Sequence, residues 1–373
     1  MAGPHVLIIG AGLGGTSLAQ ALRKRGIPFS LFERDTFEGA RFQGWAISLH
    51  SWITSDLLES TKGDLPDLGT VGITAHLGVP SEGAILNGED TSEIRRFSEG
   101  PGFQFIRADR AKLRSWLLTN IQIKWNKRFT HYEENEDGIQ AFFEDGTSYK
   151  GDILVGADGI SSRVRHQLLP YANTGTNRLN LGVIMGEVIA PEEQYRRWSE
   201  IAASFYVGVS DGRRIFVGLK SIADDQKSAQ YYWMYTWSDQ QASQESYWTA
   251  KASKEELHTF VMNHLEGLHP TLTEPIRETP VKGMLQPPLQ MKDMVPPELP
   301  TGRVTLLGDA IHPMTPFFQG EGGCQAMKDS MSLARFIEAL PSNGKGVQNA
   351  LEKYHNEMRP RAKESVLRSR AAT

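Results

Sequence analysis

The chain has 373 residues, which is long for a single hydrophobic core and suits about two domains. Its formal net charge is −4, so no broad basic face for nucleic acid is expected. Cys324 is the only cysteine, which excludes an intrachain disulfide and a cysteine-rich zinc cluster, and suits a reducing compartment. No apolar run approaches the roughly 20 residues of a membrane helix. The sequence therefore predicts a cytoplasmic protein without a metal site or transmembrane segment, and it leaves the oligomeric state open.

A glycine-rich turn, GAGLGG, follows the first apolar strand and precedes a helical pattern and a second strand. Gly10 permits a tight turn, Gly12 lets the backbone approach a pyrophosphate at the helix N-terminus, and Gly15 lets helix and strand pack closely. Glu33 ends the second strand, where its carboxylate can accept both ribose hydroxyls of a dinucleotide. This acid argues against NADP at the site, because it would repel the 2′-phosphate. Arg34, the next residue, is assigned to the same cofactor site.

Two later stretches repeat the pattern of a short apolar strand followed by an acid. The first contains Asp158 in GDILVGADGISSRVR, and the second contains Asp309 in RVTLLGDAIHP. After the second acid the chain passes through prolines and a run of glycines before an amphipathic helix begins. The glycines of this run are Gly320, Gly322 and Gly323. Either acid alone would be interpreted as a turn or a helix N-cap.

Together the three stretches resemble the flavoprotein monooxygenases of the aromatic-hydroxylase type, group A, which include para-hydroxybenzoate hydroxylase and salicylate hydroxylase. The signature of that family is a GxGxxG with an acid on the second strand, then a DG motif, then a GD motif. Here the last two are Asp158-Gly159 and Gly308-Asp309. The resemblance covers nearly the whole chain but is not clear over 172–282. It implies an α/β fold with an FAD-binding Rossmann-like domain and a β-sheet substrate domain.

The resemblance also implies further contacts to FAD. Asp309 corresponds to the family aspartate on the ribityl chain, and the glycine run begins a helix whose N-terminus points at the flavin ring. Such a helix end favours the anionic reduced flavin. Arg110 matches the family arginine that contacts FAD, while the competing Arg107 is interpreted as a solvated surface charge. Arg41 and Ala46 occupy flavin-flanking positions, although an exposed surface arginine remains the alternative for Arg41.

The chain departs from the family pattern at several positions. Glu321 stands within the usual GQG, and we expect its carboxylate to point away from the ring or to bond a neighbouring donor. Cys324 replaces a frequent Asn. Gly186 stands where fungal phenol hydroxylases often carry an arginine on the first substrate-domain strand. His312 is either a proton relay or a polar core residue, and the second interpretation is favoured. No catalytic side chain is assigned.

The domain organisation is predicted to be discontinuous. The FAD-binding domain comprises 1–70, 101–171 and 283–373, and the substrate-binding β-rich domain comprises 71–100 and 172–282. The polar run 86–102 is interpreted as a loop, and Asp211-Gly212 as the turn of a hairpin. Four aromatic residues are interpreted either as an aromatic pocket or as ordinary core: Tyr206, Phe216, Tyr232 and Tyr235.

The function implied by the resemblance is that of an FAD-dependent monooxygenase of secondary metabolism. It would use NADH or NADPH and O₂ to insert one oxygen atom into a small organic molecule, aromatic or polycyclic, through a C4a-hydroperoxyflavin on non-covalently bound FAD. The alternatives are a flavin reductase that inserts no oxygen, such as a geranylgeranyl-reductase-like enzyme, and an FAD-binding module without catalysis. A flavin halogenase is disfavoured, because the tryptophan motif WxWxIP is not found. The substrate and the choice of nicotinamide stay open.

Overall fold

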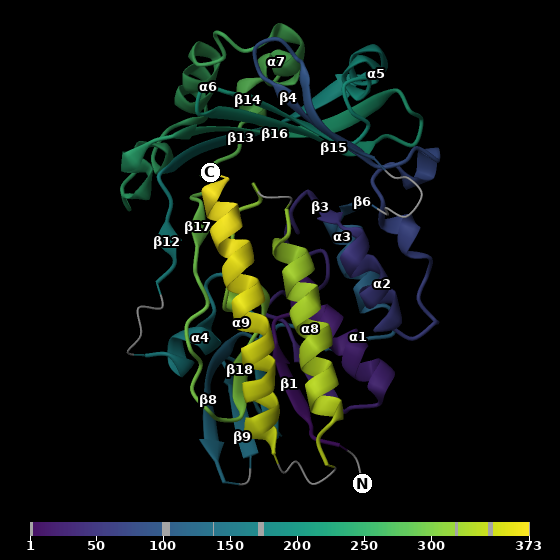
Figure 1. Cartoon of the computed structure of the whole chain (residues 1–373), viewed down its shortest axis with the longest axis vertical. Coiled ribbons are helices and arrows are strands. Elements are labelled where there is room, and N and C mark those ends of the chain that lie inside the picture. The colour runs from purple at the N-terminus through teal and green to yellow at the C-terminus, as the bar shows by residue number, and fades with distance from the viewer. Residues whose placement is uncertain are drawn as a thin grey trace.

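We describe the protein from a computed structural model that covers residues 3–98, 105–136, 138–170, 175–317, 320–341 and 346–372. Figure 1 shows a lower part, built from helices and sheets, and an upper part dominated by one large sheet. The C-terminal helix α9 (Val347–Ala371) runs along the lower part and ends beneath the large sheet. The predicted fold class, α/β with an additional β-sheet domain, is confirmed.

The lower part is centred on a five-stranded parallel sheet with the strand order β18-β11-β1-β2-β7. Every residue of β1 and β11 is buried, which explains why both strands are unbroken apolar runs in the sequence. Its strands are β1 (Val6–Ile9), β2 (Phe29–Phe32), β7 (Ile123–Lys124), β11 (Ile153–Gly156) and β18 (Val304–Leu306). Because the strands are parallel, the three motifs leave the sheet at the same edge.

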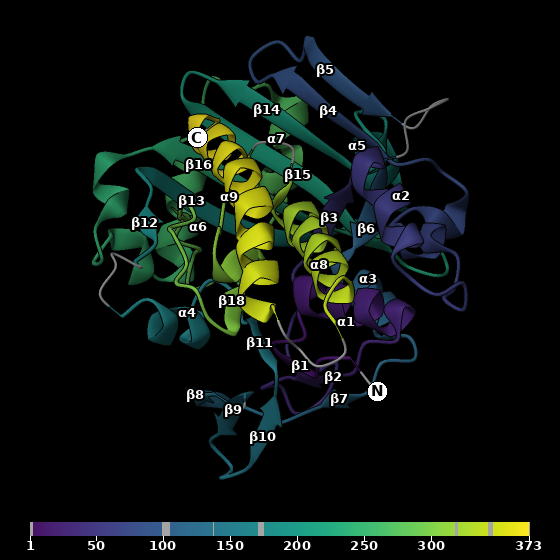
Figure 2. The ribbon, with the colours of Figure 1, turned by 60° about the horizontal axis from the view of Figure 1, so that its bottom comes forward.

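Helices and a small antiparallel sheet pack against this parallel sheet and share its hydrophobic core. The helices of the lower part besides α9 are α1 (Leu13–Arg25), α2 (Ser51–Glu59), α3 (Arg110–Leu118), α4 (Arg163–Leu168) and α8 (Gly322–Glu338). The small sheet contains β8 (Phe129–Asn135), β9 (Gly138–Phe143) and β10 (Ser148–Gly151). Figure 2 shows this sheet at the end of the molecule furthest from the large sheet.

The upper part is a six-stranded sheet in the order β13-β16-β15-β14-β4-β5, with helices packed on its outer face (Figure 1). Its strands are β4 (Glu82–Asn87), β5 (Glu93–Ser98), β13 (Leu181–Pro191), β14 (Phe205–Ser210), β15 (Arg213–Ile222) and β16 (Ser228–Ser238). The helices are α5 (Glu192–Ser199), α6 (Lys254–Asn263) and α7 (Pro270–Arg277). The predicted hairpin turn at Asp211-Gly212 is confirmed, since it joins β14 to β15.

The large sheet has two faces with different surroundings, because side chains alternate along each strand. Tyr235 and Tyr206 belong to the core that the sheet forms with α6 and α7. Tyr232, three residues before Tyr235, points to the other face, as does Phe216, and their rings lie 5.6 Å apart. The core interpretation therefore holds for two of the four predicted aromatic residues, and the other two lie on the inner face, toward the lower part.

Two short sheets complete the fold. One pairs β3 (Ala46–Leu49) with β6 (Ile106–Asp109), and the other pairs β12 (Asn177–Arg178) with β17 (Lys292–Asp293). The interpretation of 86–102 as a loop is wrong at 86–87, which end β4, and over 93–98, which form β5 at the edge of the large sheet. Polar side chains are expected on an edge strand, which faces solvent, and this explains the error. Residues 99–102 lie outside the described part of the chain.

Gly15 offers a test of the packing between α1 and β1. A Cβ atom built on Gly15 lies 1.9 Å from the carbonyl oxygen of Gly10, which is main chain and cannot rotate away. Gly15→Ala should therefore lower the free energy of unfolding by about 3 kcal/mol or more, measured by urea denaturation. Gly63→Ala is the control, because a Cβ built there meets no atom within 4 Å. Equal stability of the two variants would contradict this packing.

Candidate functional site

The three sequence motifs meet at one edge of the parallel sheet. Gly10 has a φ of +106°, and a Cβ built on it would lie 2.5 Å from the carbonyl oxygen of Ala157, so the first turn lies directly against the second motif. Arg165 joins the second motif to the third, since its guanidinium donates to the carbonyl oxygens of Ala310 (2.8 Å) and Ile160 (2.7 Å). The glycine turn, the DG turn and the GD turn thus form one connected structure.

The start of α1 faces open space beside this edge. Gly12 is its N-cap residue, no side chain caps the helix, and the first turn carries no acid. A Cβ built on Gly12 meets no protein atom within 4 Å. The first backbone N–H groups of α1 have no intrahelical partner, so this end of the helix can accept an anionic group.

Glu33 and Arg114 hold the glycine turn from two sides. The buried carboxylate of Glu33 accepts the N–H of Ala11 at 2.8 Å, and Arg114 donates from Nε to the carbonyl oxygen of the same residue at 2.7 Å. Burial lowers the pKa of Arg114, an effect that nearby Glu33 opposes. Sequence reasoning missed Arg114, although its position four residues after Arg110 places both on one side of α3.

Arg34 and Arg41 are both exposed. Arg41 forms an ion pair with Asp35, whose Oδ2 lies 2.8 Å from its Nε. Of the two interpretations of Arg41, a cofactor contact or an exposed surface arginine, the second describes its position in this structure. Any contact of Arg34 or Arg41 with a cofactor stays a prediction.

Arg110, Asp309 and Ala46 come from distant segments and gather at the same edge. Arg110 begins α3 and lies along Gly44, where a built Cβ would be 3.1 Å from its Cδ. Solvent reaches Arg110, yet protein surrounds it closely enough for desolvation to lower its pKa, which Asp309 raises and Arg41 lowers further. Ala46 opens β3 on the same side, paired with Asp109.

Asp158 carries an oxygen without a partner. Its Oδ2 accepts the N–H groups of Arg163 (2.8 Å) and Val164 (3.3 Å). Its Oδ1 is buried and has no hydrogen-bond partner among the described residues. Burial raises the pKa of this carboxyl, although Ser162 and the backbone donors act to lower it. The second motif therefore offers one unused acceptor.

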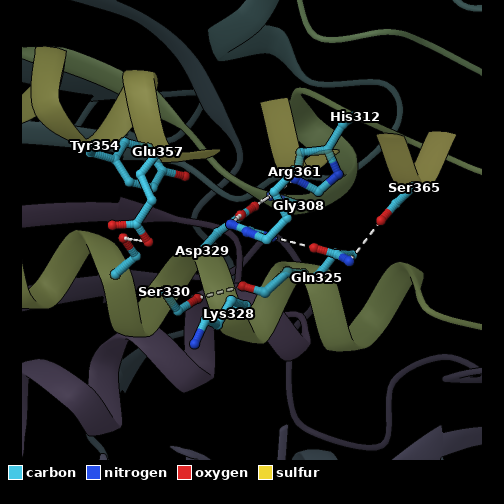
Figure 3. A network of polar contacts seen from close by, with 12 residues as sticks. Gly308, His312, Gln325, Lys328, Asp329, Ser330, Tyr354, Glu357, Arg361 and Ser365 are labelled. Carbon is cyan, nitrogen blue, oxygen red and sulfur yellow. Dashed lines mark hydrogen bonds and ion pairs between the residues drawn. The ribbon is translucent and has the colours of Figure 1, made fainter. Parts of the chain in front are cut away.

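The GD turn is held by a buried carboxylate on α8 (Figure 3). Asp329 accepts the N–H of Gly308 at 2.9 Å, a ring nitrogen of His312 at 2.6 Å and the guanidinium of Arg361 at 2.7 Å. Burial acts to raise the pKa of Asp329, but these partners hold it below its ordinary value. His312 is fully buried in this network, so its favoured interpretation as a structural residue is confirmed. Asp329 itself was not singled out from the sequence.

The N-terminus of α8 packs closely on β3. A Cβ built on Gly323 would lie 2.0 Å from the side chain of Ile47, and Gly320 has a φ of +65°. A Cβ on Gly322 would approach only Met314, at 3.4 Å. Close approach therefore explains Gly323 and backbone conformation explains Gly320, whereas the protein leaves room for a side chain at Gly322.

Glu321 turns its carboxylate toward α9, as expected from the sequence. Its Oε2 accepts the hydroxyl of Ser365 at 3.3 Å and the amide of Gln325 at 3.4 Å. Cys324 is buried and its thiol donates to the carbonyl oxygen of Ser48 at 3.1 Å. Burial raises the pKa of Cys324 to about 12, so the thiol stays neutral. Of the two departures, the buried thiol thus adds no negative charge, and the carboxylate is directed toward α9.

The interpretation of Arg107 as a solvated surface charge is wrong. Arg107 is 7% exposed, and its guanidinium donates to the hydroxyls of Ser48 (2.8 Å) and Tyr232 (2.6 Å). Its guanidinium carbon lies 5.0 Å and 5.6 Å from the ring centroids of Phe205 and Phe216. The alternation of β6, which buries Arg107 against the large sheet, cannot be read from local sequence.

An arginine at the position of Gly186 would not reach the inner face, because this position faces away from the lower part. A Cβ built there would lie 2.5 Å from the ring of Trp233, in the outer core. Its neighbour Glu187 points to the inner face, where it accepts the indole N–H of Trp45 at 2.5 Å and the ammonium of Lys220 at 3.0 Å. At this point β13 therefore presents an acid to the inner face, and not a cation.

Two family models match the chain. A model described as an FAD binding domain matches residues 113–369, and one described as an NAD(P)-binding Rossmann-like domain matches residues 8–50. An FAD-dependent monooxygenase of Trichoderma harzianum, thnD, is 39% identical over 98% of this chain and 92% of its own length. The chain belongs to the FAD-dependent monooxygenases. FAD is therefore the cofactor of this enzyme, NAD(P)H is its co-substrate, and one atom of O₂ enters a small organic molecule.

Other relatives support the same family and fold. The aurachin C monooxygenase/isomerase of Stigmatella aurantiaca is 29% identical over 90% of this chain and 81% of its own. The solved structure of Klebsiella pneumoniae HpxO with FAD and uric acid has a TM-score of 0.76 at 22% identity, covering 99% of this chain and 87% of that one. A salicylate hydroxylase substrate complex has a TM-score of 0.72 at 22% identity, covering 100% and 88%. The last two share the fold.

The described residues contain no group of three His, Cys, Asp or Glu side chains that could hold a metal ion. Within the same ranges, no helix is both long enough and apolar enough to cross a lipid bilayer.

The lowered pKa of Asp329 predicts that the stability of the protein depends on pH. Its folded pKa is lowered from an ordinary value of about 3.9, so its interactions stabilise the fold above that value and are lost as pH falls through the folded pKa. Asp329→Asn should lower the free energy of unfolding by about 3–5 kcal/mol at neutral pH, and the gap to the natural protein should shrink below about pH 4. Urea denaturation of the FAD-loaded protein across pH measures both.

Asp56→Asn is the matched control. Asp56 lies on α2 and forms a partly exposed ion pair with Lys328, the residue next to Asp329 on α8. Its effect should stay within about 1 kcal/mol. A gap for Asp329→Asn that does not change with pH would contradict the assignment of the lowered pKa.

Proposed function

We propose that this monooxygenase oxygenates a small aromatic or polycyclic metabolite between the FAD edge of the parallel sheet and the inner face of the large sheet. The observation that carries this proposal is a row of rings on that face. Trp45 stacks on Tyr232 at 4.5 Å with an interplanar angle of 11°, and Tyr232 is followed by Phe216 and Phe205. Flat apolar walls favour flat apolar ligands. The names of the relatives above, with salicylate, uric acid and aurachin C, also refer to ring compounds.

FAD fits the residues at the strand ends. The open N-terminus of α1 at Gly12 suits the pyrophosphate, and Glu33 suits the ribose hydroxyls. Asp309 and Arg110 lie together where the ribityl chain would pass. The unpartnered Oδ1 of Asp158 offers an acceptor to the same group. These roles rest on geometry and on the family pattern.

The flavin end of the cofactor would lie before Gly320, Gly322 and Gly323, beside Ala46. When bound, FAD supplies the acceptance of hydride from NAD(P)H and the activation of O₂. The chain contributes the positive end of α8, worth about 0.3–1 kcal/mol toward a neighbouring negative charge when exposed and up to about 2 when partly buried. The Glu321 carboxylate at the N-cap of this helix is bonded to Ser365 on α9.

The domain division is part of the same proposal. Residues 1–70, 101–171 and 283–373 would form the FAD-binding domain, and residues 71–100 and 172–282 the substrate-binding domain. The separate hydrophobic cores of the two principal sheets support this division, and the pairing of β4 with β14 supports including residues 71–100 in the substrate-binding domain. The boundaries near 100 and 171 lie outside the described residues. A cytoplasmic location is proposed because the single cysteine needs no oxidising compartment.

Removing charge from the cofactor site should weaken FAD binding. Asp309→Ala and Arg110→Ala each lose a charge-assisted hydrogen bond to the cofactor, worth about 1.5–3 kcal/mol, or roughly ten- to hundredfold in the dissociation constant. Fluorescence titration of apoprotein with FAD measures the change. Lys112→Ala removes an exposed charge from the same helix and should leave the constant unaltered. Wild-type affinity in both test variants would show that these residues do not hold FAD.

Oxygen insertion is distinguished from flavin reduction alone by stoichiometry. With a substrate from a panel of small aromatic and polycyclic metabolites, NAD(P)H loss and O₂ uptake should match, and the product should be heavier by one oxygen atom. Labelled O₂ followed by mass spectrometry identifies the source of that atom. Substrate turnover without incorporated label would favour the alternative of a reductase. NAD(P)H oxidation that forms only hydrogen peroxide, across the panel, would contradict the proposed substrate class.

A further inference from the structure

Arg107 differs from the other two almost fully buried arginines of the lower part. Arg114 donates to two main-chain carbonyls and has the carboxylate of Glu33 4.0 Å away. Arg165 also donates to two carbonyls, and Asp158 acts on it as a neighbouring negative charge. Both arginines hold turns of the FAD site together. Arg107 has neither a carbonyl nor a carboxylate as partner in the part of the chain that the structure describes.

The guanidinium of Arg107 is underused for a buried cation. It has five N–H donors, yet its bonds are one to Ser48 and one to Tyr232, both neutral hydroxyls. Its Nε is buried and has no acceptor within the described ranges, which is also true of Nε of Arg165 and Nη2 of Arg114, so the feature that distinguishes Arg107 is the missing counter-charge. Burying a charge without a counter-charge is costly, so this arrangement does not serve stability. Such a local conflict is typical of a functional position.

Arg107 lies where the FAD edge and the inner face of the large sheet come together. Ser48 accepts its bond from β3, and the hydroxyl oxygen of Ser48 is 4.0 Å from a Cβ built on Gly320, beside the start of α8. On the other side, Tyr232 lies on β16 and is stacked on Trp45. The guanidinium therefore connects the flavin end of the cofactor site to the aromatic wall proposed to receive the substrate.

We propose that Arg107 is a substrate-binding residue whose guanidinium, with the hydroxyl of Tyr232, binds an anionic oxygen carried on the aromatic substrate. The inference rests on the proposed function, because the ligand is its substrate. Tyr232 accepts a bond from Arg107, so its own proton is left to donate, and no acceptor for it is found among the described residues. Two donors then converge on one oxyanion in a site of low polarity, where charge-assisted bonds are strong.

This role also gives the enzyme selectivity. A neutral ligand would leave the guanidinium buried and unpaired, so an ionised hydroxyl or carboxylate on the ring is preferred over its uncharged ether. The cation comes from β6 of the lower part, since the inward position next to Gly186 on β13 is an acid, Glu187. Substrates with an acidic ring hydroxyl are the class that this geometry favours.

The first test is stability without substrate. Arg107→Met has a similar length and no charge, so the FAD-loaded variant should melt at the same temperature as the natural enzyme or higher, because an unpaired buried charge is removed. Arg95→Met is the control, an arginine that also lies over a phenylalanine ring but at the exposed edge of the large sheet. A melting temperature that falls markedly in Arg107→Met alone would assign Arg107 a structural role and overturn the proposal.

The second test is binding to the FAD-loaded enzyme by equilibrium dialysis, at mildly alkaline pH. The probes are 4-nitrophenol, which is then ionised, its neutral ether 4-nitroanisole, and 4-nitrobenzoate. The natural enzyme and Arg95→Met should bind 4-nitrophenolate at least tenfold more tightly than the ether. Arg107→Met should lose about ten- to hundredfold of the affinity for the anion while keeping that for the ether. Arg107→Lys, which retains the charge, should recover part of the loss.

The outcomes separate the possible conclusions. A natural enzyme that does not prefer an anion, or that binds none of the three probes, contradicts the proposal, as does a preference that survives in Arg107→Met. An Arg107-dependent preference for 4-nitrobenzoate over 4-nitrophenolate supports the oxyanion site but assigns it to a carboxylate. Anion binding that depends on Arg107 in an enzyme that incorporates no oxygen supports the role of the residue and contradicts only the proposed reaction.

Discussion

The structure depends on the close approach of three turns at one edge of a parallel sheet. Side chains would prevent it: a Cβ on Gly15 would lie 1.9 Å from Gly10, and one on Gly10 would lie 2.5 Å from Ala157. Once the turns are this close, their polar groups must bond to one another or to a ligand, because little water can enter between them. Arg165 and Arg114 satisfy carbonyls of these turns. What remains unpaired, above all the α1 N-terminus and Asp158 Oδ1, lies where FAD fits.

The buried charged side chains of this protein differ in the partners that surround them. Asp329 is surrounded by donors and fixes the GD turn to α8, so its charge stabilises the scaffold. Glu321, at the N-cap of α8, turns its carboxylate toward Ser365 on α9. Arg107 is the cation among these groups, and its only partners in the described structure are neutral hydroxyls. Arg114 and Arg165 each have a carboxylate nearby, so the missing counter-charge sets Arg107 apart from the other two buried arginines of the lower part, and a charged substrate would supply it at this location.

Local sequence predicted the parts of the site that depend on local backbone. Gly10 and Glu33 were identified because a strand, a turn, a helix and a terminal acid follow one another within one β-α-β unit. The orientation of Glu321 was also expected correctly, from the cost of a carboxylate beside a developing anion. By contrast, Asp329 and Arg114 act across long sequence separations, and no neighbouring residue reveals their partners. Arg107 was misassigned because a charged residue on a short strand is usually exposed, and only the large sheet above β6 buries it.

The large sheet shows why position along a strand matters more than the presence of a residue type. On β13 a shift of one residue exchanges the inner face for the outer core, so an arginine at Gly186 would point at Trp233 and not at a substrate. The next residue, Glu187, points to the inner face, and its carboxylate accepts hydrogen bonds from Trp45 and Lys220. Lys220 of β15 also reaches this face, but its ammonium is paired with Glu187, whereas Arg107 on β6 approaches the aromatic wall from the opposite side without a carboxylate partner in the described structure. Because β6 also leads into α3 and Arg110, the same short segment contributes one arginine to the cofactor site and another to the proposed substrate site. The two guanidinium groups are three residues apart in the chain, so the spacing between cofactor and substrate would be set by one rigid strand-to-helix junction.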